Sequence, residues 1–262
     1  MFQGGEAAGG VGNNMEPVSF PSDFYIVDVG MNDGADSLYY WKRGFRVLAI
    51  EANPKLVEKA EGEFRGLGAD IDVICAAVSD RTGSQPFYVN KNNDVWSSLQ
   101  PDTGARRGGS DVIEVETCDL SELLLPHCSK LFYVKIDIEG YDGVALSQVL
   151  RLPELPRYIS VENGNKLMIE MLSEKGFSKF KFYNQRHVRD AKIPQNSQMG
   201  EIVGHTFPFG SSGLFGEDLP GRWLSADEAL TINEGLVYGR NLAPENLWAE
   251  GIGWFDLHAS RV

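Results

Sequence analysis

The sequence is poor in cysteine, in basic residues and in long apolar runs, and each shortage excludes a class of protein. Its 262 residues include three cysteines without CxxC spacing, which argues against a disulfide framework or a zinc knuckle. The 24 Lys and Arg residues face 37 Asp and Glu residues, so the formal net charge is −13 and nucleic acid is an improbable partner. No apolar run reaches the roughly 18 residues of a membrane span, so no membrane partner is expected.

The beginning of the chain is rich in Gly, Ala and Asn, and it has neither the cationic start nor the apolar core of a signal sequence. We expect a flexible tail over residues 1–20 and a cytoplasmic location. The 42% hydrophobic content is sufficient for one buried core, so residues 21–262 are predicted to form a single α/β domain.

The most informative segment is residues 24–34, where an apolar run of strand type leads into a turn containing Gly30 and Gly34. A parallel strand turns into a helix around a nucleotide in this way. A second apolar strand, over residues 47–50, ends in Glu51. An acid at that position can accept hydrogen bonds from both hydroxyls of an adenosine ribose. The two motifs together predict a cofactor that contains adenosine.

The turn differs from that of a dinucleotide-binding protein. Dinucleotide binding requires GxGxxG, and here Asn32 and Ala35 occupy the second and third glycine positions. The Asn32 side chain would crowd a diphosphate, and Asp28 would repel its charge. S-adenosylmethionine fits better, because its sulfonium and amino groups favour a nearby carboxylate. A nicotinamide-dependent oxidoreductase, or a turn that binds nothing, remains an alternative.

Strand-like and helix-like segments alternate up to about residue 162, as a parallel sheet with crossover helices requires. Two further strands, over residues 85–89 and 112–117, are expected to flank a polar insert. The strand over residues 131–139 places Lys135, Asp137 and Glu139 on one face. Central parallel strands are normally apolar on both faces, so this charged face is predicted to open into a crevice. An ion pair at a sheet edge is the alternative.

Residues 184–222 are rich in Gly, Ser, Pro and Phe. A loop of this length inside a compact domain is usually functional or disordered. We expect it to be a loop or lid at the substrate site.

These segments resemble the FkbM-type family of S-adenosylmethionine-dependent methyltransferases. The matching pieces are residues 28–34, 51–54, 77–80, 96–99 and, most specifically, the KIDIEG segment at 135–140. The resemblance implies a Rossmann-like class I methyltransferase fold with a mostly parallel seven-stranded sheet, an antiparallel edge strand and a β insert. It also implies methylation of a hydroxyl on a sugar or a specialised small-molecule metabolite.

The resemblance assigns roles to individual residues. Asp28 and Gly30 would hold the methionine part, Glu51 the ribose, and Ser79 or Asp80 would lie near the adenine. Asp137 would lie close to the reacting methyl group. The predicted cofactor-binding set is Asp28, Gly30, Asn32, Asp33, Gly34, Glu51, Ala52, Ser79, Asp80, Ser98 and Asp137.

A hydroxyl acceptor needs a base or a metal ion to become a good nucleophile. Asp137, Glu139 and His205 are the candidate bases. Alternatively, Asp137, Glu162 and Asn163 would supply three oxygen ligands of the kind that Mg²⁺ prefers. A module that binds the cofactor without catalysis is a further alternative, and the sequence leaves the oligomeric state open.

Overall fold

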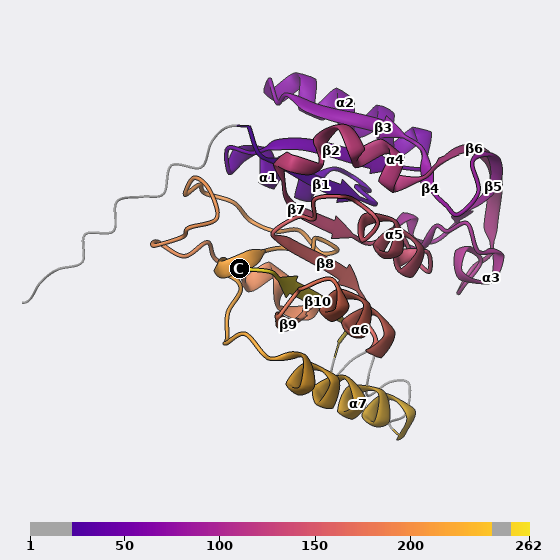
Figure 1. The fold of residues 1–262 in the computed structure, drawn as a ribbon. Helices are drawn as coiled ribbons and strands as arrows, with labels where there is room; N and C mark the ends of the chain where they lie inside the picture. Colours follow the sequence, from indigo (N-terminus) through magenta and orange to yellow (C-terminus); the bar gives the residue numbers. More distant parts are fainter. Residues whose placement is uncertain (1–22, 243–252) are drawn as a thin grey trace, which may run out of the picture.

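A seven-stranded sheet forms the centre of the protein in the computed structural model, which describes residues 23–242 and 253–262 (Figure 1). The strands are β1 (Tyr25–Val29), β2 (Arg46–Glu51), β3 (Ile71–Cys75), β7 (Leu131–Ile136), β8 (Tyr158–Glu162), β9 (Lys179–Asn184) and β10 (Phe255–Ser260). Their order is β3-β2-β1-β7-β8-β10-β9. Among the described strands of this sheet, β10 alone runs in the reverse direction, antiparallel to both β8 and β9. The predicted Rossmann-like, mostly parallel sheet is confirmed, with its reversed strand β10 placed just inside the outermost strand β9.

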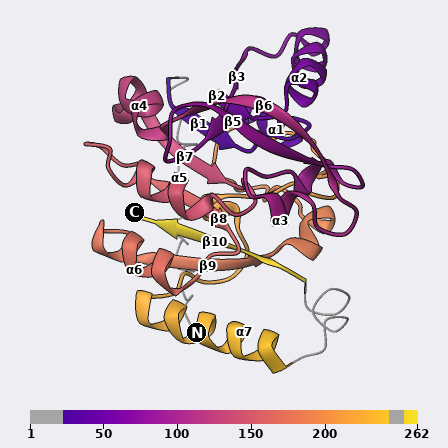
Figure 2. The ribbon, with the colours of Figure 1, turned by 90° about the vertical axis from the view of Figure 1, so that its right-hand side faces the viewer.

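Helices cover both faces of the sheet. They are α1 (Ala35–Lys42), α2 (Pro54–Leu67), α4 (Leu120–Leu124), α5 (Asp142–Val149), α6 (Lys166–Glu174) and α7 (Ala226–Leu242). The main apolar core joins one face of the sheet to α4, α5, α6 and α7, while α1 and α2 pack against the other face. Figure 2 shows α4, α5 and α6 following one another along one side of the sheet.

Helix α2 shows how the sequence sets its own limits. The Asn53 side chain accepts a hydrogen bond from the Lys55 N–H, and Pro54 occupies the first turn, where no N–H partner is needed. Gly68 ends the helix in the left-handed conformation, with φ of 67°. The helix buries Leu56 and Phe64 toward the sheet.

The predicted β insert is confirmed as a separate three-stranded sheet of order β4-β6-β5. Its strands are β4 (Ala77–Val78), β5 (Gly83–Asn90) and β6 (Ser110–Cys118). Two short helices, η1 (Asp94–Trp96) and α3 (Pro101–Gly104), lie in the connection between β5 and β6. We call residues 91–109, which include both helices, the insert loop.

The segment 184–222 is packed over much of its length. It contains the short helices η3 (Gln185–Asp190) and η4 (Gly216–Asp218), and another, η2 (Leu125–Lys130), precedes β7. Phe207 and Phe215 are buried, and the Phe215 ring stacks on Tyr133 with centroids 4.9 Å apart. Residues 208–210 are exposed at the tip of this segment. A role as a lid remains a prediction.

The tail predicted over residues 1–20 lies outside the described residues. Within residues 23–242 and 253–262, no helix combines the length and the apolar character needed to cross a membrane.

Candidate functional site

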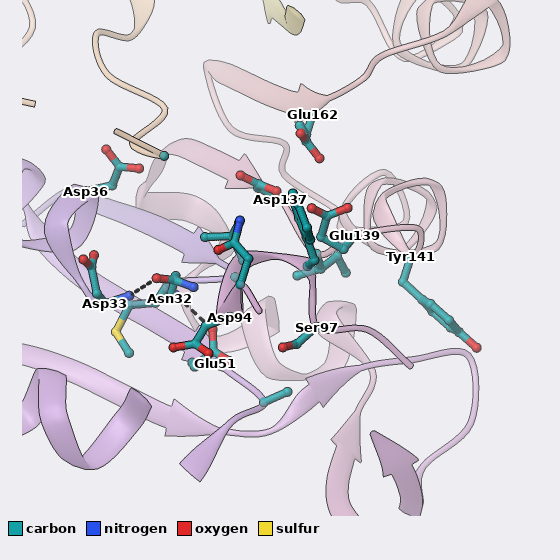
Figure 3. Close-up of a pocket in the computed structure, with 18 of the residues that line it drawn as sticks. Asn32, Asp33, Asp36, Glu51, Asp94, Ser97, Asp137, Glu139, Tyr141 and Glu162 are labelled. Carbon is teal, nitrogen blue, oxygen red and sulfur yellow. Dashed lines mark hydrogen bonds between the residues drawn. The ribbon is translucent and has the colours of Figure 1, made fainter. Parts of the chain in front are cut away.

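A cavity of about 540 Å³ opens where β1, β2, β7 and β8 end. The turns after these strands form its floor, and the insert loop and the tip at residues 208–210 complete its wall. Parallel sheets place ligands at the carboxyl ends of their strands, and this volume is typical of a small-molecule site. Figure 3 shows Asp137, Glu139 and Glu162 on one side of the cavity, across from Asn32 and Glu51.

Gly30 has a conformation and a position that only glycine tolerates. Its φ is +84°, and a Cβ built on it would lie 1.8 Å from the carbonyl oxygen of Asp137. The Asp137 N–H donates to the Val29 carbonyl at 2.9 Å, so the first turn and the KIDIEG segment are held in contact. Gly34 has a similar constraint, because its Cβ would meet the Phe64 ring at 2.5 Å. Gly30 lines the cavity, whereas Gly34 does not.

Glu51 is held in place by the backbone of the neighbouring turns. One carboxylate oxygen accepts from the Asn32 N–H at 2.9 Å and the other from the Asn53 N–H at 2.8 Å. The side chain lines the cavity but is only 8% exposed, and this burial raises its pKa from 4.5 to about 7. Asn32, Asp33 and Ala52 also line the cavity, and their contact with a cofactor remains a prediction.

Asp28 lies beneath the cavity and does not line it. Its carboxylate accepts from the Ser37 hydroxyl at 2.6 Å and forms an ion pair with Lys135 at 3.0 Å. Lys135 also donates to the Gly30 carbonyl at 2.8 Å. The two charged residues face each other across β1 and β7, so the ion pair considered for Lys135 exists, but in the centre of the sheet and not at an edge. A direct contact of Asp28 with the methionine part remains a prediction.

The acidic side of the cavity contains Asp137, Glu139 and Glu162. Burial raises the pKa of Asp137, while burial and the neighbouring Asp137 charge raise that of Glu162. Glu139 receives two hydrogen bonds from the Arg106 guanidinium, at 2.9 and 2.5 Å. Its pKa still rises to about 7, because burial outweighs the effect of Arg106. The cavity is therefore suited to a ligand that carries positive charge.

The insert loop is fastened to the same segment. The Ser98 hydroxyl donates to the Glu139 carbonyl at 2.7 Å, and the Gln100 amide donates to the Gly140 carbonyl at 3.0 Å. Ser98 is buried and does not line the cavity. It holds the wall in place without reaching the ligand space.

Part of the cavity wall is apolar and is formed by Ala77, Val78 and Phe87. Ser79 and Asp80 do not line the cavity. The Ser79 hydroxyl instead accepts from the Gln85 side chain at 3.0 Å. Their proximity to an adenine remains a prediction.

His205 does not reach the cavity. Its ring packs against Tyr39 and Phe207, with centroids 5.0 and 4.7 Å away. Burial lowers its pKa to about 4, so the imidazole is neutral at physiological pH. In this conformation the side chain is part of the aromatic packing, and its proposed role as a base would require a movement of the loop.

The predicted magnesium site gains no support. Asp137 and Glu162 are close enough to share a hydrogen bond, and Asn163 lines the cavity beside them. However, no group of three His, Cys, Asp or Glu side chains in the described part of the chain is arranged to hold a metal ion. Asn163 has a φ of 49°, and its N–H donates to the Phe255 carbonyl at 3.0 Å, which gives it a structural role in the turn.

Sequence reasoning missed several residues of the site. Arg106 was visible in the sequence, but its partner Glu139 lies 33 positions away. Asp36 lines the cavity and accepts from the Ser212 N–H at 2.7 Å, a contact across 176 positions. Trp254 lines the cavity just before β10. No local pattern marks such contacts. The one available signal was an acidic residue, Asp36, in the first turn of α1.

Comparison with known proteins gives a family match and distant structural matches. The methyltransferase FkbM domain matches residues 28–179, and no curated protein matches the chain. A TehB-like SAM-dependent methyltransferase from Corynebacterium glutamicum is 14% identical, with a TM-score of 0.34 over 63% of this chain and 71% of that one. Geranyl diphosphate C-methyltransferase from Streptomyces coelicolor A3(2) is 10% identical, with a TM-score of 0.42 over 92% and 74%. EvdMO1 is 14% identical, with a TM-score of 0.35 over 61% of this chain; the chain spans 33% of its length.

Proposed function

The chain belongs to the methyltransferase FkbM domain family, and we propose that it transfers a methyl group from S-adenosylmethionine to a hydroxyl of a sugar or a specialised small-molecule metabolite. The observation that carries this proposal is the cavity itself. It joins an apolar end at Ala77 and Phe87, a buried acid at Glu51, and an acidic side at Asp137 and Glu162. An adenine, a ribose and a sulfonium group require these three environments in this order.

The residues present fit the cofactor. At Gly30 the first turn lies so close to the KIDIEG segment that a Cβ would meet the Asp137 carbonyl oxygen, which fixes the two turns that form the floor of the cofactor site. Glu51 has two oxygens that would accept from the ribose hydroxyls in addition to their backbone amides. S-adenosylmethionine supplies a methyl group on a positively charged sulfur, and the carboxylates of this chain would stabilise that charge in the bound state.

The acceptor hydroxyl must lose its proton to become a good nucleophile. Glu139 has both carboxylate oxygens engaged by Arg106. Asp137 has no ion-pair partner within 4 Å among the described residues, and it lies at the end of β7 facing the cavity. We therefore assign Asp137 as the base and Glu139 as a residue that shapes the site. Alignment of donor and acceptor in the cavity would lower the activation free energy by roughly 7–11 kcal/mol.

A labelled-methyl transfer screen against a panel of hydroxylated sugars and phenols tests the proposal. We expect transfer to at least one member, loss of turnover in Asp137→Asn, and retained turnover in Glu122→Gln, which alters an exposed residue of α4. Binding of S-adenosylmethionine without turnover on any member would favour a binding module. Binding of NAD in its place would favour the oxidoreductase alternative. Loss of turnover with EDTA, restored by Mg²⁺, would overturn Asp137 as a metal-independent base.

A further inference from the structure

Two aromatic side chains form a corner in the wall of the cavity, and one of them, Trp254, directly precedes Phe255, whose carbonyl accepts from the Asn163 N–H. The rings of Phe209 and Trp254 lie 5.7 Å apart at an angle of 74°, and both residues line the cavity. Phe209 is 60% exposed, although Phe207 and Phe215 of the same segment are buried. Together with Trp254, this ring gives the cavity wall an aromatic surface of the kind that ligand pockets use for contact.

The position of Phe209 is fixed on both sides. Before it, Phe207 packs edge-on against Tyr39, with centroids 4.8 Å apart. After it, the Ser212 N–H donates to the Asp36 carboxylate at 2.7 Å. The exposed ring is therefore presented by an anchored turn.

The surroundings of this corner define the chemistry of its ligand. Asp137 and Glu162 offer oxygens that accept hydrogen bonds from hydroxyl groups (Figure 3). The aromatic rings of Phe209 and Trp254 offer an apolar surface. A ring-shaped molecule with hydroxyls on its edge would satisfy both surfaces at once. Of the cations that line the cavity, Arg106 is paired with Glu139 and Lys135 with Asp28, while Arg107 stacks on Trp96. The Arg189 guanidinium lies 5.2 Å from the centroid of the Phe209 ring. A phosphorylated ligand would bring its negative charge toward the carboxylates of the cavity.

We propose that Phe209 and Trp254 form the acceptor-binding subsite, which takes an uncharged ring bearing hydroxyl groups. This inference rests on the proposed function, because it names the acceptor for the same cavity. Both residues lie outside residues 28–179, which match the family domain. The choice of acceptor is thus made by a part of the chain beyond the family segment. A saccharide and a phenol share the required chemistry, and separate probes distinguish them.

Saturation-transfer NMR on the full chain loaded with S-adenosylhomocysteine tests the subsite. The probes are methyl β-D-glucopyranoside, catechol and glucose 6-phosphate. We expect one of the two uncharged probes to bind, and Phe209→Ala or Trp254→Ala to weaken that binding about tenfold, as loss of an aromatic contact does. Tyr238→Ala is the matched control, because Tyr238 is 67% exposed on α7 and does not line the cavity.

Calorimetry with S-adenosylhomocysteine separates failure of the subsite from failure of the proposed function. The cofactor product should bind the wild type and both aromatic variants with equal affinity. The subsite is wrong if S-adenosylhomocysteine binds but neither uncharged probe does, or if only glucose 6-phosphate binds. It is also wrong if Phe209→Ala and Trp254→Ala bind the probe as the wild type does. If the product does not bind the wild type, the proposed function is wrong and the subsite falls with it.

Discussion

Replacement of Gly30 by alanine tests the contact on which the cavity floor depends. The φ of +84° places an L-residue in the left-handed region, which costs about 1–2 kcal/mol. The new Cβ would lie 1.8 Å from the Asp137 carbonyl oxygen, so the backbone must move, at an overpacking cost of about 1–3 kcal/mol. We expect a total loss of about 2–5 kcal/mol in the free energy of unfolding.

Urea denaturation measures this loss, and Gly62→Ala is the matched control. Gly62 lies inside α2, its φ is ordinary and a Cβ there would meet nothing within 4 Å. That substitution should raise stability by up to about 1 kcal/mol, because glycine is a poor helix former. Calorimetry should also show that Gly30→Ala loses affinity for S-adenosylmethionine while Gly62→Ala keeps it. If the two variants unfold at the same urea concentration, the close approach of the first turn to the KIDIEG segment is wrong.

Three further predictions concern the charged residues. Glu51→Gln should weaken S-adenosylmethionine binding about 10- to 100-fold, which is the value of a charge-assisted hydrogen bond. Glu61→Gln, at an exposed position of α2, should not weaken it. Equal calorimetric affinities of the two variants would contradict this. Because burial raises the Glu51 pKa from 4.5 to about 7, the folded chain binds this proton more tightly than the unfolded chain. The stability that this proton gives is full below pH 4.5 and is lost as pH rises through 7. Between these pH values the free energy of unfolding of the wild type, measured with urea, should therefore fall relative to that of Glu51→Gln by on the order of 3 kcal/mol. Lys135→Met should cost about 3–5 kcal/mol by leaving buried Asp28 unpaired, and addition of Asp28→Asn should recover part of it; no recovery in thermal unfolding would refute the pairing.

Local sequence patterns were sufficient for the elements that build the floor of the cavity. The turn after β1 and the acid at the end of β2 each depend on residues within a few positions of one another. These elements therefore appear in the structure where the sequence predicts them.

Contacts across the sheet could not be derived in this way. A strand pattern shows that Asp28 and Lys135 are charged residues in apolar strands, but their pairing depends on the register between β1 and β7. His205 was a candidate base because it lies in the segment predicted to form a lid over the substrate site. Its packing against Tyr39 is set by a helix far away in the chain, which no local signal reports.

The register that hides Asp28 also explains why the cavity is acidic. Lys135 lines the cavity, yet its ammonium is bound by the Asp28 carboxylate and the Gly30 carbonyl. It therefore partly offsets the charges of Asp137 and Glu51 without forming an ion pair with either. If Lys135 pointed into the cavity unpaired, it would repel a sulfonium and an ammonium group at the same place. The buried ion pair thus offsets the charge of this cation, and the remaining carboxylates of the cavity favour a positively charged donor.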